Sequence, residues 1–103
     1  RAMKLRFVEA STGELEGAIN YSRANFGLGD ELNAAVKKAI SNIMADPFRS
    51  PKRRDGLRSF SLTRFPYILI LQPDEECGTV TFYAFAHTSR RPGYWKLHIS
   101  TPP

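Results

Sequence analysis

The feature of this sequence that most constrains its fold is a change of hydrophobic period along the chain. Between about residues 15 and 43, apolar side chains recur every three or four positions, which predicts amphipathic helices. From residue 57 to residue 86 they alternate with polar side chains or form short continuous runs, which predicts strands. Helices and strands segregated in this way favour an α+β domain over repeated βαβ units.

The expected order of elements is β-α-α-β-β-β. A strand over Lys4–Glu9 precedes two helices, which are joined at Gly27-Leu-Gly29 and end at Asp46-Pro47. Ser11-Thr-Gly-Glu14 has the spacing of a capping box, so these two side chains are expected to cap the first helix. The helices should form an antiparallel hairpin packed on one face of a curved, mainly antiparallel sheet with a C-terminal β-hairpin, and the other face should stay free. The second helix carries an apolar stripe: Leu32, Ala35, Val36, Ala39, Ile40 and Ile43.

The length and the single cysteine limit the class of protein. A chain of 103 residues predicts one domain, which we place at residues 3–98, with a cloning remnant at 1–2 and a flexible tail at 99–103. Cys77 is the only cysteine, which excludes an intramolecular disulfide and favours a reduced, cytoplasmic protein. No apolar run approaches the roughly 20 residues that cross a bilayer, so no membrane association is expected.

Positive charge is concentrated in the second half of the chain. The formal net charge is +5, and residues 49–103, with nine basic and four acidic groups, account for all of it. One stretch contains six cations and a single acidic residue, Asp55. The six are Arg49, Lys52, Arg53, Arg54, Arg58 and Arg64. Such a cluster can attract phosphates or an acidic protein segment, although a solvated loop without a partner is the alternative.

Few residues could perform acid–base chemistry near neutral pH. The chain has two histidines and none of the HExxH, P-loop, GxGxxG or nucleophile-elbow motifs, so neither a metal nor a cofactor is expected. The segment His87–Trp95 stands out because it gathers one imidazole, two guanidinium groups, a phenol and an indole. Arg90 and Arg91 suit phosphates or carboxylates. Tyr94 and Trp95 could anchor an interface, or they could cover the end of a small core.

Several of these pieces, in this order, resemble the RelE/ParE superfamily of bacterial toxins. The chain is similar to its ParE-like, plasmid-stabilisation branch. The matching pieces are Glu14-Leu-Glu-Gly-Ala-Ile-Asn-Tyr21, Phe26-Gly-Leu-Gly29, the stretch from Ala39 to Pro47, Arg58, Arg64-Phe-Pro-Tyr67 and His87-Thr-Ser-Arg90-Arg91-Pro-Gly-Tyr94-Trp95. The resemblance implies the toxin of a type II toxin–antitoxin system, which arrests growth and is neutralised by an acidic, ParD-like antitoxin in a hetero-oligomeric complex.

Two mechanisms are compatible with this resemblance. ParE-like toxins act by inhibiting DNA gyrase, and this non-enzymatic function is the one we expect, with Arg90, Arg91, Tyr94 and Trp95 binding the target and no sequence-specific DNA binding. RelE-like members are metal-independent, ribosome-dependent mRNA endonucleases, and that alternative would use His87, Arg64, Arg90 and Tyr94. The strand face before these residues supplies neither carboxylate nor lysine, which disfavours cleavage. It consists of Tyr67, Leu69, Leu71, Thr81, Tyr83 and Phe85.

The residues expected to bind the antitoxin form two groups. Tyr21, Phe26 and Leu28 are apolar side chains of the helical hairpin that lie beyond its packing stripe. The second group is cationic and consists of Arg53, Arg54 and Arg58. An amphipathic helix followed by an acidic extended segment would suit both groups. A basic protein-interaction module without toxicity is a third alternative, which a growth assay distinguishes.

Overall fold

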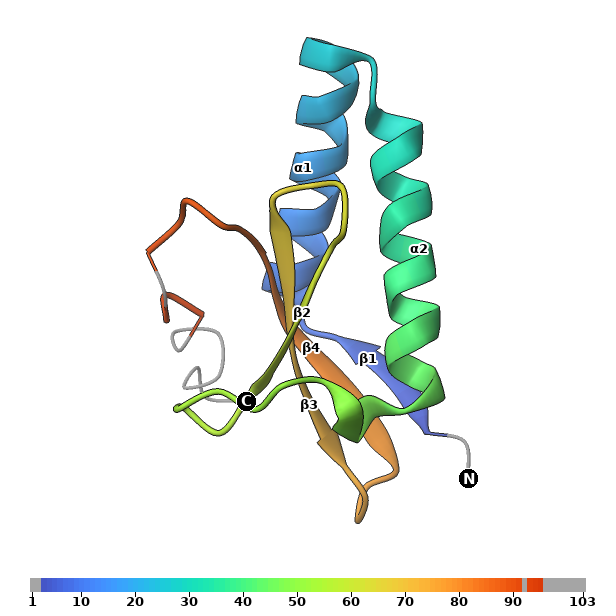
Figure 1. Cartoon of the computed structure of the whole chain (residues 1–103), viewed down its shortest axis with the longest axis vertical. Coiled ribbons are helices and arrows are strands. Elements are labelled where there is room, and N and C mark those ends of the chain that lie inside the picture. Colours follow the sequence, from blue (N-terminus) through green and yellow to red (C-terminus); the bar gives the residue numbers. More distant parts are fainter. Residues whose placement is uncertain (1–2, 92, 96–103) are drawn as a thin grey trace.

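The helices and strands of this protein form two layers, with a helical hairpin on one face of a four-stranded sheet (Figure 1). A computed structural model describes residues 3–91 and 93–95. The expected cloning remnant at 1–2, the domain end at 98 and the tail at 99–103 lie outside the described residues. The elements are β1 (Lys4–Phe7), α1 (Glu9–Phe26), α2 (Gly29–Ala45), the 3-10 helix η1 (Pro47–Arg49), β2 (Arg58–Ser61), β3 (Tyr67–Asp74) and β4 (Thr79–His87).

The sheet is mixed and mainly antiparallel. Its strand order is β1-β4-β3-β2, with β1 parallel to β4 and the other two pairs antiparallel. This confirms the expected α+β architecture in the order β-α-α-β-β-β. Within the part of the chain that the structure describes, no helix has the length and apolar character needed to cross a membrane.

The two helices were expected to be joined at Gly27-Leu-Gly29. Gly27 ends α1 as expected, whereas Gly29 is already the first residue of α2. Gly27 has a φ of +68°, which favours glycine, and its N–H donates to the Arg23 carbonyl at 3.3 Å. Gly29 belongs to α2, where a Cβ atom would lie 2.8 Å from the Cβ of Arg23. Glycine at position 29 therefore permits a close approach of the helices.

The predicted capping box at the start of α1 is wrong. The helix begins at Glu9, because the Val8 N–H still bonds to the Phe82 carbonyl and the chain turns into the helix directly after β1. Ser11 consequently lies inside the first turns and is fully buried. Glu14 lies one turn later, where its carboxylate accepts hydrogen bonds from β4 and from the segment after β4. The described residues of this C-terminal segment are 88–91 and 93–95.

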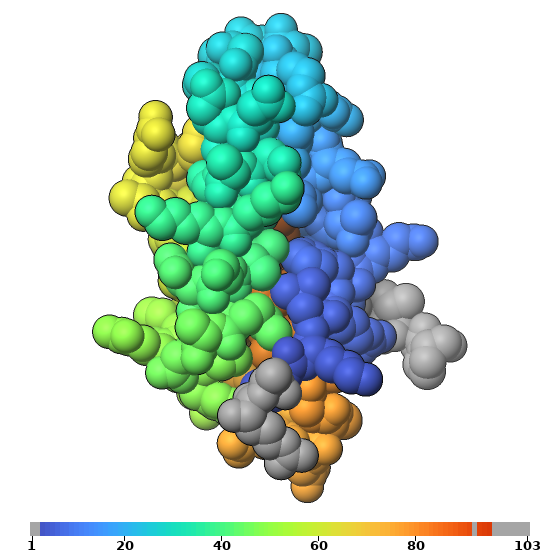
Figure 2. Space-filling view, turned by 90° about the vertical axis from the view of Figure 1, so that its right-hand side faces the viewer, coloured from blue at the N-terminus to red at the C-terminus, as the bar shows by residue number. Residues whose placement is uncertain are grey.

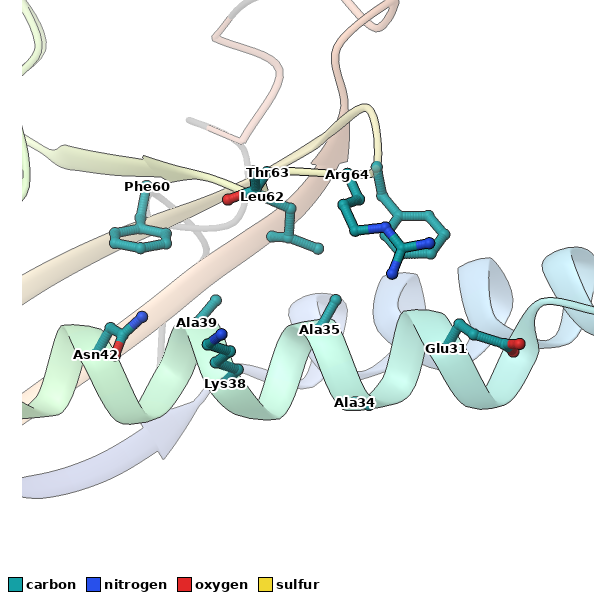
Figure 3. A pocket seen from close by; sticks show the side chains of 11 residues that line it. Glu31, Ala34, Ala35, Lys38, Ala39, Asn42, Phe60, Leu62, Thr63 and Arg64 are labelled. Atoms are coloured by element: carbon teal, nitrogen blue, oxygen red, sulfur yellow. The ribbon is translucent and has the colours of Figure 1, made fainter.

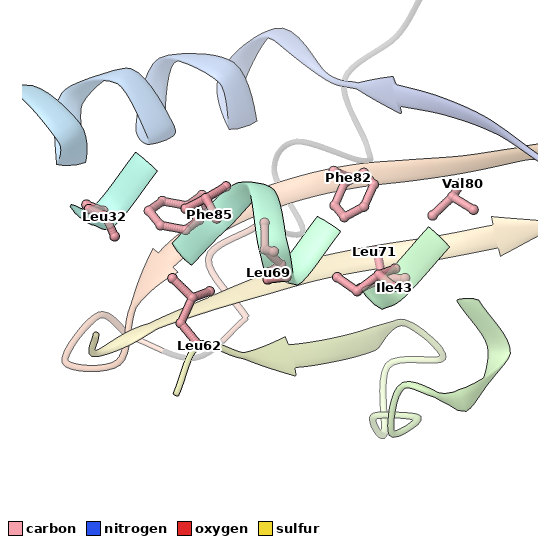
Figure 4. Close-up of a cluster of buried hydrophobic side chains, with 10 residues drawn as sticks. Leu32, Ile43, Leu62, Leu69, Leu71, Val80, Phe82 and Phe85 are labelled. Atoms are coloured by element: carbon pink, nitrogen blue, oxygen red, sulfur yellow. The ribbon is translucent and has the colours of Figure 1, made fainter. Parts of the chain in front are cut away.

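The main core lies between the hairpin and the sheet. Four side chains of the predicted apolar stripe of α2 are buried, and the other two, Ala35 and Ile40, are half-buried against the same core. Figure 4 shows how α2 and the strands contribute to this core. Its buried members are Leu32, Val36, Ala39, Ile43, Leu62, Leu69, Leu71, Val80, Phe82 and Phe85.

A β-bulge in β4 changes which side chains face the helices. Ile70 pairs with Ala84 and Leu71 with Phe82, so Tyr83 is an extra residue on β4. Because of this extra residue, Phe82 and Phe85 both pack on the helix side. The expected single face from Tyr67 to Phe85 is therefore wrong: Thr81 and Tyr83 lie on the other face, beside Arg6 and Gln72.

The second face of the sheet is partly covered, which corrects the expectation that it stays free. Trp95 is 2% exposed and packs there with four buried apolar side chains from the sheet and the loop before it. They are Leu57, Ile70, Ala84 and Ala86. The segment after β4 thus folds back over the sheet, opposite the helices (Figure 1).

Candidate functional site

The segment that follows β4 is attached to α1 through a tyrosine and a carboxylate. The Tyr94 hydroxyl donates to Glu14 Oε2 at 2.7 Å, and the Phe85 backbone N–H donates to Glu14 Oε1 at 3.0 Å. Burial, together with the hydrogen bond and the negative charge of Glu14, raises the pKa of Tyr94 well above its usual value. The Tyr94 hydroxyl is therefore protonated near neutral pH and acts as the donor in its hydrogen bond to Glu14.

Arg90 lies on the outer side of this tyrosine. Its guanidinium carbon is 4.0 Å from the centre of the Tyr94 ring, a cation–π geometry. The Arg90 N–H donates to the His87 carbonyl at 2.9 Å, closing a tight turn at the end of β4. Arg90 and Arg91 are both exposed, so the two guanidinium groups are available to an acidic partner.

His87 is engaged within the same turn. Its Nδ1 accepts a hydrogen bond from the Ser89 N–H at 3.0 Å and lies 2.7 Å from the Ser89 hydroxyl. A neutral imidazole that accepts at Nδ1 carries its proton on Nε2. The Tyr67 ring also packs edge-on against His87, with 5.2 Å between ring centres. These contacts give His87 a structural role in the turn.

Trp95 has a structural role next to a second carboxylate. Its Nε1 donates to Asp55 Oδ2 at 3.2 Å, and the Arg53 guanidinium lies 4.6 Å from its ring centre. Burial alone would raise the pKa of Asp55, but hydrogen bonds from the Leu57 N–H and from Trp95, with the nearby charge of Arg53, lower it below the usual value. Because Trp95 is buried, its ring is not part of the surface that Arg90 and Arg91 form.

The four residues of the nuclease alternative are not brought together as a set. His87, Arg90 and Tyr94 share the segment after β4, whereas Arg64 lies in the β2–β3 loop and its side chain points toward α2 (Figure 3). Among the described residues, no three His, Cys, Asp or Glu side chains are grouped closely enough to hold a metal ion.

The cationic residues expected to bind an antitoxin differ in their contacts. Arg58 donates to the backbone carbonyls of Phe48 at 2.9 Å and Ser50 at 2.8 Å, so it fastens the η1 loop to β2. Arg53 pairs with Asp55, as described above. Arg54 is exposed. Two of the three arginines therefore stabilise the fold of this loop in addition to any external role.

The apolar residues expected to bind an antitoxin lie at the tip of the helical hairpin. Tyr21 is 58% exposed, Phe26 is 65% exposed, and their rings meet edge to face at 6.0 Å. Leu28 is 39% exposed beside them. The hairpin tip forms one end of the long axis, which measures 41 Å, and the loop at residues 50–57 lies in the other half of the molecule (Figure 1). The two predicted antitoxin-binding groups are thus separate surfaces.

The sequence interpretation missed a groove between these two surfaces. It has a volume of about 440 Å³ and lies between α2 and the β2–β3 loop. In Figure 2 this loop is yellow and lies beside the green helix α2. Small side chains on α2 form its floor, and Glu31, Lys38 and Arg64 lie at its rim (Figure 3). The signal in the sequence was the set of alanines on α2: Ala34, Ala35 and Ala39.

Solved structures provide the comparison for this arrangement. A chain of the chromosomal ParDE toxin–antitoxin system from P. aeruginosa superposes with a TM-score of 0.70 at 13% identity, covering 85% of this chain and 98% of that one. A chain of the toxin–antitoxin complex RelBE2 from Mycobacterium tuberculosis superposes with a TM-score of 0.59 at 25% identity, covering 84% of this chain and 99% of that one. The chain has the fold of the RelE/ParE superfamily.

Comparison of the sequence alone gives no further relative. No protein-family model matches the chain. No curated protein matches it either. The RelE/ParE fold therefore rests on the order of elements, on the sheet topology and on the two superpositions.

Two carboxylates that bind the segment after β4, those of Glu14 and Asp55, were not predicted from the sequence as parts of the site. Glu14 was assigned to a helix cap, and Asp55 was counted only as a charge within the basic stretch. Both carboxylates hold aromatic residues of the C-terminal segment, at sequence separations of 80 and 40 residues. Contacts between residues so far apart in the sequence cannot be predicted from local spacing.

Proposed function

We propose that this chain is the toxin of a type II toxin–antitoxin pair, that it acts in the ParE-like manner by binding and inhibiting DNA gyrase, and that an acidic ParD-like antitoxin neutralises it in the cytoplasm. Superposition over nearly the whole length of chains from two toxin–antitoxin complexes supports the first part. The contacts of the segment after β4 support the second.

The observation that carries the choice of target binding over catalysis is the state of His87 and Tyr94. A metal-free nuclease needs a base with a free lone pair and an acid that releases its proton. His87 Nδ1 is engaged by Ser89, and the raised pKa of Tyr94 makes this phenol a weaker acid than usual. Arg90 and Arg91, in contrast, are exposed and suited to carboxylates on a protein surface.

A ribosome-dependent mRNA interferase is the second candidate. It is favoured by the 25% identity to a chain of the RelBE2 complex, compared with 13% for the ParDE chain. The two candidates predict different losses in the cell, namely of supercoiling or of intact mRNA.

Controlled expression in bacteria, with both losses measured in parallel, tests the function. We expect growth arrest, inhibition of purified gyrase and intact mRNA, with His87→Ala retaining toxicity. The double variant Arg90→Ala/Arg91→Ala should lose most of its toxicity while keeping its melting temperature. Ribosome-dependent cleavage that disappears in His87→Ala would establish the interferase instead, and absence of toxicity would support a plain interaction module.

The proposed antitoxin must contact two separate surfaces. To connect the hairpin tip with the loop at residues 50–57, a partner has to extend over much of the 41 Å long axis. The whole axis corresponds to about 27 residues of helix or about 12 residues of extended chain, which sets an upper limit for this connection. A partner that wraps around the domain and carries acidic residues fits both this length and the net charge of +5.

Copurification with the product of the adjacent gene tests this partner, and association rates measured at low and high salt test its electrostatic part. Reversing the charge of Arg53 would place a carboxylate beside Asp55 and Trp95 and would damage the fold. The exposed pair Arg49→Glu/Arg54→Glu is therefore the better variant, with Lys37→Glu on exposed α2 surface as a single-charge control. We expect slower association in the double variant and at high salt. Association rates unaffected by either change would refute the electrostatic part.

A further inference from the structure

We infer that Glu14 is a positioning residue for the proposed target-binding surface: it holds Tyr94, and through Tyr94 it holds the Arg90 side chain in the orientation that meets an acidic group of the target. The inference rests on the proposed function, because it assigns a role to Arg90 in target binding. Glu14 itself lies behind this surface, on α1.

The position of Glu14 follows from the shape of the sheet. β1 is short and pairs with β4 only from Thr79 to Phe82, so no strand of the described residues lies beside the next part of β4 on that side. Glu14 fills this place, since one carboxylate oxygen accepts the Phe85 N–H at 3.0 Å. The other oxygen accepts the Tyr94 hydroxyl proton at 2.7 Å. A single carboxylate thus connects α1, β4 and the C-terminal segment.

The connection continues from Tyr94 to Arg90. The Tyr94 hydroxyl is held by Glu14, and the Tyr94 ring packs against the second core, with 5.3 Å between its centre and that of the buried Trp95 ring. Arg90 packs on the face of this fixed ring, 4.0 Å from its centre. An arginine held in place before binding loses less rotamer entropy on binding, so it contributes more affinity than a freely moving one.

Three variants and a control separate this role from general stability. Glu14→Ala removes both hydrogen bonds of the carboxylate, whereas Tyr94→Phe removes only the one from Tyr94 and keeps the ring on which Arg90 packs. Glu14→Gln preserves the geometry, because its carbonyl oxygen can accept the Phe85 N–H while its NH₂ group donates to the Tyr94 hydroxyl oxygen. Glu16→Ala removes an exposed carboxylate from the same helix and serves as the control.

The first measurement is the rate of trypsin cleavage after Arg90, followed by mass spectrometry. Trypsin does not cut before proline, so the bond after Arg91 is resistant and cleavage in this turn reports on Arg90. We expect cleavage about tenfold faster in Glu14→Ala and Tyr94→Phe, in keeping with loss of a charge-assisted hydrogen bond. Glu14→Gln and Glu16→Ala should remain within about twofold of the wild type.

The second measurement is affinity for purified gyrase, with affinity for the antitoxin as the structural reference. Glu14→Ala and Tyr94→Phe should each weaken gyrase binding about tenfold, which is about 1.4 kcal/mol, and leave antitoxin binding unchanged. The double variant Glu14→Ala/Tyr94→Phe should bind gyrase at most about twofold more weakly than either single variant, because both changes break the same hydrogen bond. Glu14→Gln should restore most of the affinity.

Two results would overturn the inference. One is unchanged cleavage and unchanged gyrase affinity in Tyr94→Phe, the variant that disturbs the fold least. The other is an equal loss of gyrase and antitoxin binding in step with the melting temperature, which would assign Glu14 a general structural role. If the wild-type protein does not bind gyrase, the proposed target is refuted, and the cleavage rates alone decide whether Glu14 holds Arg90.

Discussion

Replacing Trp95 with phenylalanine tests the separation between core and binding surface in the C-terminal segment. The change removes the hydrogen bond from Nε1 to Asp55 Oδ2, now 3.2 Å long, in a site where Trp95 is 2% exposed. A hydrogen bond to a charged group contributes about 2 kcal/mol. The smaller ring leaves roughly 40 Å³ unfilled, which costs about 1 kcal/mol more. We therefore expect a loss of about 3 kcal/mol in the free energy of unfolding.

Urea unfolding followed by far-UV circular dichroism measures this loss. Tryptophan fluorescence cannot be used, because Trp95 is the only tryptophan in the chain. With an m-value of about 1.2 kcal/mol per molar, the midpoint should fall by about 2.5 M. Tyr21→Phe is the matched control, since Tyr21 is 58% exposed and its replacement should change stability by less than about 0.5 kcal/mol.

A loss smaller than about 1 kcal/mol would refute the assignment of Trp95 to the core. A double-mutant cycle then tests the hydrogen bond itself. Trp95→Phe and Asp55→Ala should be non-additive by about 1 kcal/mol or more, because each removes one partner of the same contact. Additive losses would show that the stability comes from burial of the ring alone.

Three further predictions concern Asp55, two glycines and Tyr94. The folded-state pKa of Asp55 is lowered, so the ionised carboxylate stabilises the fold above its unfolded pKa, and this stabilisation is lost as pH falls. The difference in free energy of unfolding between the wild type and Asp55→Asn should therefore shrink when pH is lowered from about 5 to about 2. Gly27→Ala should cost about 1–2 kcal/mol in thermal unfolding because φ is +68°. Gly17→Ala, in the exposed helix interior with no atom near its Cβ position, should stabilise by up to about 1 kcal/mol. The pKa of Tyr94 is raised, so Tyr94→Phe should remove the last tyrosine to ionise in an ultraviolet titration, and wild-type stability should fall as pH rises past about 10.

Local patterns in the sequence determined the elements and most of the helix-side core. The apolar stripe of α2, the positive φ of Gly27 and the end of the second helix at Asp46-Pro47 each depend on neighbours a few residues away. The switch of hydrophobic period determined the α+β class in the same way. The exposed aromatic residues at the hairpin tip could also be predicted, because they fall outside the stripe.

The faces of β4 and the start of α1 could not be predicted from such patterns. Alternation along β4 holds only until the extra residue Tyr83, and a bulge has no signature in a single sequence. The capping-box spacing of Ser11 and Glu14 is real, but β1 leads into the helix at Glu9 and leaves both residues inside it.

The tertiary structure alone decided the roles within the C-terminal segment. The sequence left Tyr94 and Trp95 either as interface residues or as cover for the core. The structure places Trp95 inside the second core and Tyr94 between Glu14 and the exposed Arg90. These roles depend on carboxylates 40 and 80 residues away, which the strand order and the helix crossing bring to the segment. Contacts at such separations form only when the chain is folded, because strand pairing and helix packing bring the two residues together, so no local spacing in the sequence indicates which residues will meet.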